Sequence, residues 1–518
     1  MSSTSPNILF IVLDTQRRDR LSVYGNQRET SPELDDFSTG ATLFQRAISP
    51  AQWTIPAHAS MFTGLYPSTH ELVEANRVLS GSYPTLPEIL QASGYHTVGF
   101  CNNPLVGVLN TGLQRGFDNF YNYAGAAPNR PLQTRRFGLP QPLSIRWQRF
   151  ARAVSNQFAH NDWLFRVSLH PLLTPIWTRY VNYKGDAETS IGDVIDYMAY
   201  HRGQNRDKPL FTFLNLMGTH LPYRPPQDAL DRIAPSLRHD RQAYKFMGRF
   251  NADAARWASP VVPPLQDWEH QVIEDFYDAE IAHQDRHLGR LLHALRQSGA
   301  LDDTMVIIAA DHGEGHGDHD FFGHSFVVYQ ELVHVPLMIH YPERFPAGKK
   351  VATNVSTRRL FHTVLDVAGI TPPLAADDPN ADVEALSLTR SLNGKPDTER
   401  GLAFTEAFPP QTFLSVMRHR APALIDQLAL TQVRRGVYQN EHKLAVVADR
   451  VEGLFDVRQD PTEINDVSKQ HAPLVVELKA KLASFVKQAV EVRADSLAQQ
   501  TEVSDEVIEN LRALGYIE

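Results

Sequence analysis

Cysteine is nearly absent from this chain of 518 residues, in which Cys101 is the single example. One thiol excludes an intrachain disulfide and any zinc site built from cysteines. Long apolar runs are lacking too: no stretch approaches the ~20 residues that cross a bilayer, so we expect no membrane span. Strong charge is also lacking, and a net charge of −9 gives no electrostatic case for a nucleic-acid partner.

The remaining composition is that of an ordinary globular protein, with 42% hydrophobic and 21% charged residues. A chain of this length is too large for one small core, so we expect two or three structural units. The amino terminus has no basic segment, and the apolar stretch 7–13 is short and is followed by an acid. This stretch is typical of a buried strand rather than a signal peptide, and we expect a cytoplasmic location.

Apolar runs alternate with helical patterns along most of the chain. The expected strands are Ile8–Leu13, Tyr95–Cys101, Pro209–Met217, Met305–Ala310 and Val335–His340. Helical patterns precede two of them, at Leu86–Gly94 and at Asp267–Gln297. This rhythm predicts an α/β fold with a doubly wound, mostly parallel sheet flanked by helices.

The pattern changes after residue 370. We therefore predict a catalytic α/β domain over 1–370 and a smaller α+β subdomain over 371–518. In the subdomain, Leu444–Val447 and Gly453–Asp456 favour a small antiparallel sheet, and a helix is expected near Leu474–Gln488.

Two inserts interrupt the main domain, at about 125–180 and 221–265, and we expect both to cap one edge of the sheet. The first carries several arginines, either an anion-binding cap or, more simply, a solvated face: Arg130, Arg135, Arg136, Arg146 and Arg149.

Chemistry-bearing side chains follow three of the expected strands. Asp14 ends the first, His220 lies just beyond the Pro209 strand, and Asp311-His312 ends the Met305 strand. In open α/β sheets the ligand site lies at the carboxyl ends of the strands. An acid directly after a buried strand is costly unless it is paired or binds a cation, although each acid alone is also consistent with a solvated strand end. Together with a hydroxyl, two acids and an imidazole form a suitable set for one divalent metal.

That hydroxyl is provided by Thr54, in the stretch AQWTIPAHASMFTG of residues 51–64. Pro56 favours the first turn of a helix, and Thr54 is expected as its cap. The positive end of a helix attracts anions, so this position suits an anionic ligand, although an ordinary capping threonine fits the same pattern.

The most specific local signal is the loop Asp311–Asp320, DHGEGHGDHD, which has three histidines and four acids. Glycine-laced clusters of this kind are unusual on plain surface. His316 and His319 fit either a functional role or simple solvation.

Several motifs, taken in order, resemble those of one enzyme family. They lie at residues 12–16, 54–64, 219–223, 310–314, 323–325, 329–331, 335–337, 453–456 and 511–516. Together they resemble the sulfatase branch of the alkaline phosphatase superfamily, which includes arylsulfatases and phosphonate monoester hydrolases. The resemblance implies an alkaline-phosphatase-like fold and a metal-dependent ester hydrolase.

Carried over by position, the resemblance implies a metal site and a set of catalytic side chains. The implied metal ligands are Asp14, Thr54, Asp311 and His312, with Thr54 also the nucleophile. His220 would contact the ester or protonate the leaving group. His324 stands where the family often has lysine, and His58 stands where the sulfatase motif has arginine.

The departures from the family pattern bear on the reaction. Formylglycine sulfatases need Cys or Ser where this chain has Thr54, so the nucleophile here must be an alcohol. Thr15 replaces a second acidic ligand, and the stretch Cys101–Pro104 lacks a sulfate-binding lysine. Leu216 stands where two-metal relatives carry an acid, which favours a single metal.

The sequence therefore predicts a hydrolase or transferase of phosphate mono- or diesters that uses one divalent ion, Mn²⁺, Mg²⁺, Ca²⁺ or Zn²⁺. The expected partner is a small anionic ester, and the sequence does not indicate the oligomeric state. Two alternatives stay open: a sulfatase that uses an unmodified threonine, and a non-catalytic sulfatase-like binding protein.

Overall fold

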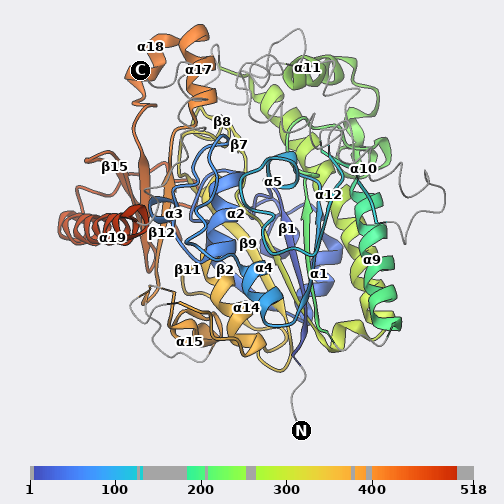
Figure 1. The fold of residues 1–518 in the computed structure, drawn as a ribbon. Coiled ribbons are helices and arrows are strands. Elements are labelled where there is room, and N and C mark those ends of the chain that lie inside the picture. The colour runs from blue at the N-terminus through green and yellow to red at the C-terminus, as the bar shows by residue number, and fades with distance from the viewer. Residues whose placement is uncertain are drawn as a thin grey trace, which may run out of the picture.

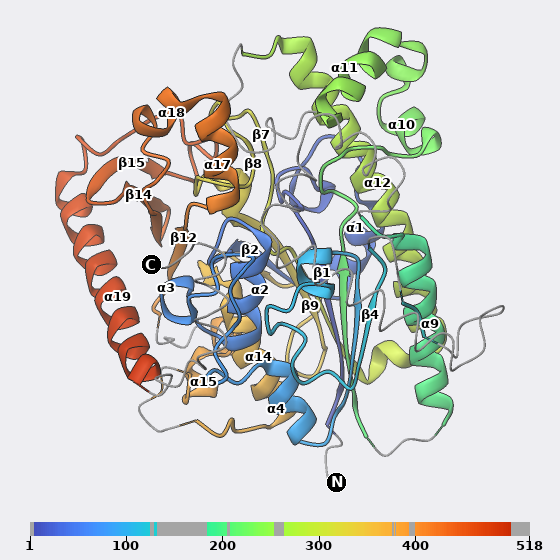
Figure 2. The same ribbon diagram turned by 45° about the horizontal axis from the view of Figure 1, so that its top comes forward.

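The structure is a computed structural model, shown as a ribbon in Figures 1 and 2. It describes residues 5–124, 129–131, 184–204, 208–252, 264–374, 378, 380–392 and 399–498. Most of the first insert therefore lies outside the described residues, with Arg135, Arg136, Arg146 and Arg149, and so does the motif at 511–516.

A large mixed sheet forms the centre of the molecule, with strand order β10-β2-β9-β6-β1-β5-β3-β4, and β11 pairs with β2. In that order the strands are Lys350–Val351, Thr42–Ile48, His334–His340, Thr304–Ala309, Asn7–Leu13, Leu210–Leu216, His96–Cys101 and Asn119–Asn122, with β11 at Val355–Ser356. Among the described strands of this sheet, β9 alone runs against its neighbours β2 and β6. The predicted mostly parallel α/β sheet is confirmed.

The sheet is buried on both faces because its strands are apolar at nearly every position. In β1, Leu9, Ile11 and Leu13 enter one hydrophobic core, and the alternate residues Ile8, Phe10 and Val12 enter the other. The first core packs against α1 (Pro32–Thr39), α9 (Ala187–Gly203) and α12 (Asp267–Gln297). The second packs against α2 (Thr54–Thr63), α4 (Leu86–Ala92) and α14 (Leu360–Ala368), so the helices cover both faces (Figure 1).

The register aligns the carboxyl ends of the central strands. Val12 of β1 is paired with Ala309 of β6 and with Asn215 of β5, and Cys101 of β3 is also paired with Asn215. The residues that follow β1, β3 and β6 therefore meet at one edge of the sheet. This edge is where the sequence predicts the site.

A separate antiparallel sheet, β12-β13-β14-β15, forms the carboxy-terminal part, as predicted. Its strands are Leu402–Ala407, Arg434–Gln439, His442–Val447 and Arg450–Asp456. Helix α19 (Ala472–Ala498) packs on it through Leu478, Leu482 and Phe485, and both views place this unit beside the main sheet (Figure 2). The domain boundary at residue 370 stays a prediction.

The described part of the second insert is helical, and it contains no strand. Helices α10 (Gln227–Ile233) and α11 (Arg241–Ala252) pack near α12, and Phe246 and Phe250 enter the same core. In the first insert, Arg130 forms an ion pair of 2.7 Å with Asp193 on α9. This single ion pair tests neither interpretation of the arginines, so both stay predictions.

The remaining elements are short. They are η1 (Ser22–Tyr24), α3 (Pro67–His70), α5 (Pro104–Gly107), η3 (Pro235–His239), η5 (Ala300–Asp302), β7 (Gly315–His316), β8 (Phe322–Gly323), α13 (Gln330–Val333), η6 (Thr357–Arg359), α15 (Val383–Leu386), α16 (Thr389–Leu392), α17 (Gln411–Arg420) and α18 (Pro422–Gln427). Across the described ranges, no helix combines the length and the apolar character needed to cross a membrane.

Candidate active site

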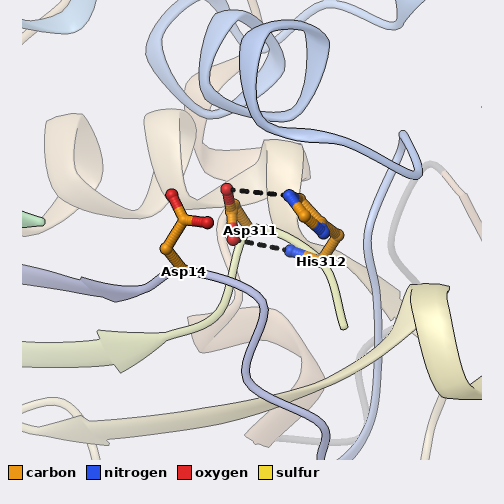
Figure 3. A group of neighbouring side chains, drawn as sticks. All are labelled: Asp14, Asp311 and His312. Carbon is orange, nitrogen blue, oxygen red and sulfur yellow. Dashed lines mark hydrogen bonds and ion pairs between the residues drawn. The ribbon is translucent and has the colours of Figure 1, made fainter. Parts of the chain in front are cut away.

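Three buried side chains at the carboxyl edge of the sheet form a group that can hold a metal ion. Asp14 follows β1, Asp311 and His312 follow β6, and one ligand atom from each lies within 4.8 Å of the others. All three are fully buried, and Figure 3 shows them converging. The three were expected as ligands from their positions after apolar strands, and the fold brings them together.

The carboxylates of this group fit a cation. Asp14 Oδ1 and Asp311 Oδ2 are buried and have no hydrogen-bond partner, which is costly for charged oxygens. Burial raises the pKa of Asp14 to about 6. Burial, and then the charge of Asp14, raises the pKa of Asp311 well above its usual range. A divalent ion between the two would satisfy both free oxygens and remove their mutual repulsion.

His312 is also prepared for a metal. Its Nδ1 lies 2.8 Å from the carbonyl oxygen of Gly313, so Nδ1 carries the proton and donates it. Nε2 then has its lone pair available on the side of Thr54, whose Oγ1 is 3.3 Å away. Burial lowers the pKa of His312 well below its ordinary value, which keeps the imidazole neutral, as metal ligation requires.

Thr54 starts helix α2, but the expected cap is wrong by one residue. Trp53 is the N-cap, Thr54 is the first helical residue, and Pro56 is the third. The Thr54 hydroxyl is therefore not used to cap the helix. It faces His312 and lies 3.5 Å from Asn103 Nδ2, in a residue that is only 1% exposed.

Two asparagines complete the surroundings of Asp14, and sequence reasoning missed both. Asn103 Nδ2 donates to Asp14 Oδ2 over 2.6 Å and also approaches Thr54. Asn215 Nδ2 lies 3.4 Å from the same oxygen of Asp14 and 3.3 Å from His58 Nε2. The available signal was position: Asn103 follows the end of β3, and Asn215 lies near the end of β5.

His58 lies in α2, next to the metal group. Its Nδ1 donates to the carbonyl oxygen of Thr54 over 2.9 Å and lies 3.5 Å from Asp311 Oδ2. Burial lowers the pKa of His58 to about 4. A neutral, fully buried imidazole in this place supports the first turn of α2, which carries Thr54, and packs behind Asp311.

Two further histidines extend the site beyond His312. The ring centroid of His324 is 4.5 Å from that of His312 and 5.1 Å from that of His220. His220 Nδ1 donates to the carbonyl oxygen of Leu221 over 2.6 Å. His324 Nδ1 lies 2.7 Å from Glu314 Oε1. Burial alone lowers the pKa of His324, but the charge and the hydrogen bond of Glu314 raise it above its ordinary value.

The later part of the loop Asp311–Asp320 anchors the site. His316 Nε2 lies 3.1 Å from the Tyr223 hydroxyl, and Asp318 forms a 2.8 Å ion pair with Arg17. His319 Nδ1 lies 2.9 Å from Glu331, and its Nε2 lies 2.9 Å from the carbonyl oxygen of Thr462. His316 is buried and His319 has two partners, so neither is simply solvated.

Thr15 contributes through its main chain rather than as a substitute acid. Its φ is +57°, which is rare for a β-branched residue. Its backbone N–H donates to Asp311 Oδ1 over 3.2 Å, and its hydroxyl donates to the carbonyl oxygen of Asp14 over 2.7 Å. Asp311 Oδ1 is thereby occupied, and Oδ2 is the oxygen left for a cation.

Comparison with known proteins places the chain in a family. Residues 6–370 match the family described as Sulfatase. The chain belongs to the sulfatase family. Like its relatives, this sulfatase-family chain is a hydrolase of the sulfuric and phosphoric ester class, and the family is metal-dependent.

Among curated relatives, an arylsulfatase of Clostridium perfringens is 26% identical over 421 residues, which are 76% of this chain and 80% of the relative. Arylsulfatase K of Bos taurus is 24% identical and covers 93% of this chain and 82% of its own length.

Solved structures share the fold. The phosphonate monoester hydrolase of Agrobacterium radiobacter has a TM-score of 0.64 at 22% identity, covering 93% of this chain and 96% of the other. A protein in complex with D-glucosamine-2-N,6-O-disulfate has a TM-score of 0.62 at 19% identity, covering 95% and 98%. The alkaline-phosphatase-like fold expected from the sequence is confirmed.

Proposed function

We propose that this sulfatase-family protein is a metal-dependent hydrolase or transferase of phosphate mono- or diesters, with Thr54 as the nucleophile. One observation carries the proposal: the Thr54 hydroxyl is buried, is not used as a helix cap, and lies 3.3 Å from His312 Nε2, in a site where one oxygen each of Asp14 and Asp311 lacks a hydrogen bond. A hydroxyl placed among metal ligands is placed to react as an alkoxide.

The residues that would hold the metal are Asp14, Asp311, His312 and Thr54. The bound ion would lower the pKa of the Thr54 hydroxyl and offset negative charge in the transition state. Few donors, one of them an imidazole, suit Zn²⁺ or Mn²⁺ better than Ca²⁺, which takes six to eight oxygen ligands. Asn103 donates a hydrogen bond to Asp14 and approaches Thr54, so it would fix the position of the nucleophile relative to one metal ligand.

The chain's own residues then account for two displacements. In the first, Thr54 Oγ1, which would already have lost its proton to solvent and be an alkoxide, attacks phosphorus; the bond from phosphorus to the ester oxygen breaks, and His324 or His220 gives the leaving oxygen a proton. In the second, water or an acceptor alcohol attacks the phosphoryl group on Thr54, and the threonine oxygen leaves. The same histidine takes the proton from the attacking molecule, so the enzyme returns to its starting state.

Threonine favours phosphorus over sulfur. A formylglycine hydrate releases sulfate by breaking its own C–O bond, and threonine has no such route. Direct attack at the central atom is required, and phosphorus accepts in-line displacement in metal-stabilised sites. The alternative, a sulfuric ester hydrolase with unmodified threonine, is supported by the relatives that are named arylsulfatases.

The test is turnover of matched nitrophenyl phosphate, phosphodiester and sulfate esters with Mn²⁺, Zn²⁺, Mg²⁺ or Ca²⁺ added. We expect phosphoester turnover with Mn²⁺ or Zn²⁺, and a loss of at least ~10²–10³-fold in Thr54→Ala. Mass analysis of quenched reactions should find a phosphoryl group on the peptide that contains Thr54. Preferred sulfate turnover would select the alternative, and full activity of Thr54→Ala would reject the covalent route.

A further inference from the structure

Glu314 is a buried carboxylate that lies close to the metal group but does not belong to it. It follows His312 by two positions, is fully buried, and is not among the residues whose ligand atoms converge. Its Oε1 lies 2.7 Å from His324 Nδ1. Burying a carboxylate is costly unless it is paired, and Glu314 is paired with this imidazole.

The backbone around Glu314 is fixed, so the carboxylate has a defined position. The N–H of Gly313 donates to the carbonyl oxygen of Leu332 over 2.7 Å. Arg17 donates to the carbonyl oxygen of Glu314 over 3.3 Å. Strand β7 begins at the next residue, Gly315. His324 directly follows β8, the strand that pairs with β7.

The contact determines which nitrogen of His324 can act. An ionised carboxylate only accepts, so Nδ1 must donate to Glu314. The other nitrogen, Nε2, lies across the ring and is directed away from Glu314. The His324 ring lies beside His312 and His220, and His312 in turn contacts Thr54. His324 is therefore part of the same site as Thr54.

We propose that Glu314 is a positioning residue that orients His324 Nε2 toward the leaving oxygen; this proposal rests on the proposed function. The pair would allow the enzyme to cleave esters of alkyl alcohols. An alkoxide is a poor leaving group, so an ester of an alkyl alcohol depends on a proton delivered as the bond breaks. A nitrophenolate leaves without that help. The proton passes from His324 Nε2 to the leaving oxygen, and the histidine recovers it from the water that attacks in the second displacement.

A double-mutant cycle tests whether Glu314 acts through His324. Glu314→Ala should lower kcat for methyl phosphate esters by ~10–100-fold with little change in KM, as loss of an orienting carboxylate does elsewhere. In a His324→Ala background the same change should cost less than about twofold, since residues that act as one unit are not additive. Glu314→Gln, which keeps an acceptor oxygen, should restore part of the loss.

Two readouts separate orientation from a structural defect. The loss in Glu314→Ala should be several-fold larger for the methyl ester than for the matched nitrophenyl ester. As a matched control, Glu331→Gln alters the other carboxylate–histidine pair of the same loop, Glu331 with His319. That variant should change both esters equally and by less than about twofold.

Equal losses in the two His324 backgrounds, or equal losses on both esters, would overturn the proposal. The cycle uses whichever ester the wild-type enzyme turns over, so preference for sulfate would reject the phosphoester function and leave the Glu314 test intact. Nitrogen-15 spectra of labelled histidine give a readout that does not require turnover. They should show Nδ1 of His324 protonated in both the acid and the neutral form of the wild type, with the transferable proton of the acid form at Nε2, and a mixture of Nδ1 and Nε2 tautomers in the neutral ring of Glu314→Ala. Unchanged spectra would also overturn the proposal.

Discussion

The backbone N–H of Thr15 donates to Asp311 Oδ1 over 3.2 Å, and it does so from a backbone with φ of +57°. A β-branched residue in that region costs ~1–3 kcal/mol, which persists only where the surroundings enforce it. The bond joins the end of β1 to the end of β6 and fixes one carboxylate of the metal group.

Thr15→Gly should therefore retain metal affinity to within a few-fold, because glycine keeps the N–H and adopts positive φ freely. Thr15→Pro should lower the affinity by ~10–100-fold, since proline removes the N–H and holds φ near −65°. Titration calorimetry with Mn²⁺ or Zn²⁺ measures both. If Thr15→Gly loses as much as Thr15→Pro, the side chain and not the N–H holds Asp311.

Removal of the metal should destabilise the fold in a pH-dependent way. In the absence of metal, burial raises the pKa of Asp14 from 3.8 to about 6, and the pKa of Asp311 rises as well. A raised pKa means that the fold binds protons more tightly than the unfolded chain, so stability from these groups is present below pH 3.8 and is lost as pH rises through 6.

The gain in melting temperature on adding metal should consequently grow between pH 5 and pH 8. At a hundredfold excess over Kd the stabilisation amounts to ~2.7 kcal/mol. Thermal melts with and without chelator, across that pH range, measure it. The Asp311→Asn variant is the control, and it should show a smaller response to metal and a flatter pH dependence. A gain that shrinks as pH rises would contradict this assignment of the carboxylates.

Gly313 should not tolerate a side chain. A Cβ at this position would lie 1.9 Å from the carbonyl oxygen of Glu331, a backbone atom that cannot move aside cheaply. Gly313→Ala should therefore displace His312 and lower metal affinity by at least ~10-fold.

Gly192→Ala is the matched control. Gly192 lies inside α9 with open space around it, and alanine there should stabilise the protein by ~0.5–1 kcal/mol. Equal metal affinity in the two variants would show that the loop can shift without loss.

The pair of Lys443 and Glu463 should be needed for stability but not for chemistry. Both side chains are fully buried, and their charged atoms lie 2.7 Å apart. Lys443→Met leaves Glu463 without a counter-charge and should cost ~3–5 kcal/mol in the free energy of unfolding. Adding Glu463→Leu should recover most of the loss. Denaturant unfolding measures both, and kcat below the unfolding range should stay within twofold of the wild type in the double variant.

How far the sequence predicts this structure depends on the kind of feature. The strands that precede Asp14 and Asp311 could be predicted, because a short, fully apolar run that is followed by an acid is typical of a buried strand. Helix α12 matches its predicted bounds at Asp267 and Gln297 because a capping box and a long helical pattern define it. The start of α2 was placed one residue late because a hydroxyl residue ahead of a proline looks like a cap.

Contacts between strands were not predictable in the same way. Asn103 and Asn215 reach Asp14 only because β3, β5 and β1 are neighbours in a particular register, and one sequence does not reveal strand order. The pairing of Glu314 with His324 spans ten residues that fold back through β7 and β8. Residue types at strand ends could therefore be predicted, whereas their partners needed the fold.

The small sheet is attached to the nucleophile segment itself. The N–H of Glu406 in β12 donates to the carbonyl oxygen of Pro50 over 3.0 Å, and Glu406 bridges to Ala51, three residues before Thr54. The side chain of Glu406 also accepts from the N–H of Ser68 over 2.8 Å, just beyond α2. A fragment that ends at residue 370 would keep every expected metal ligand. It would lose the contacts that Glu406 makes with the segments before and after α2. We therefore expect the region matched by the family to be inactive by itself, and removal of residues 371–518 should abolish activity before it unfolds the main sheet.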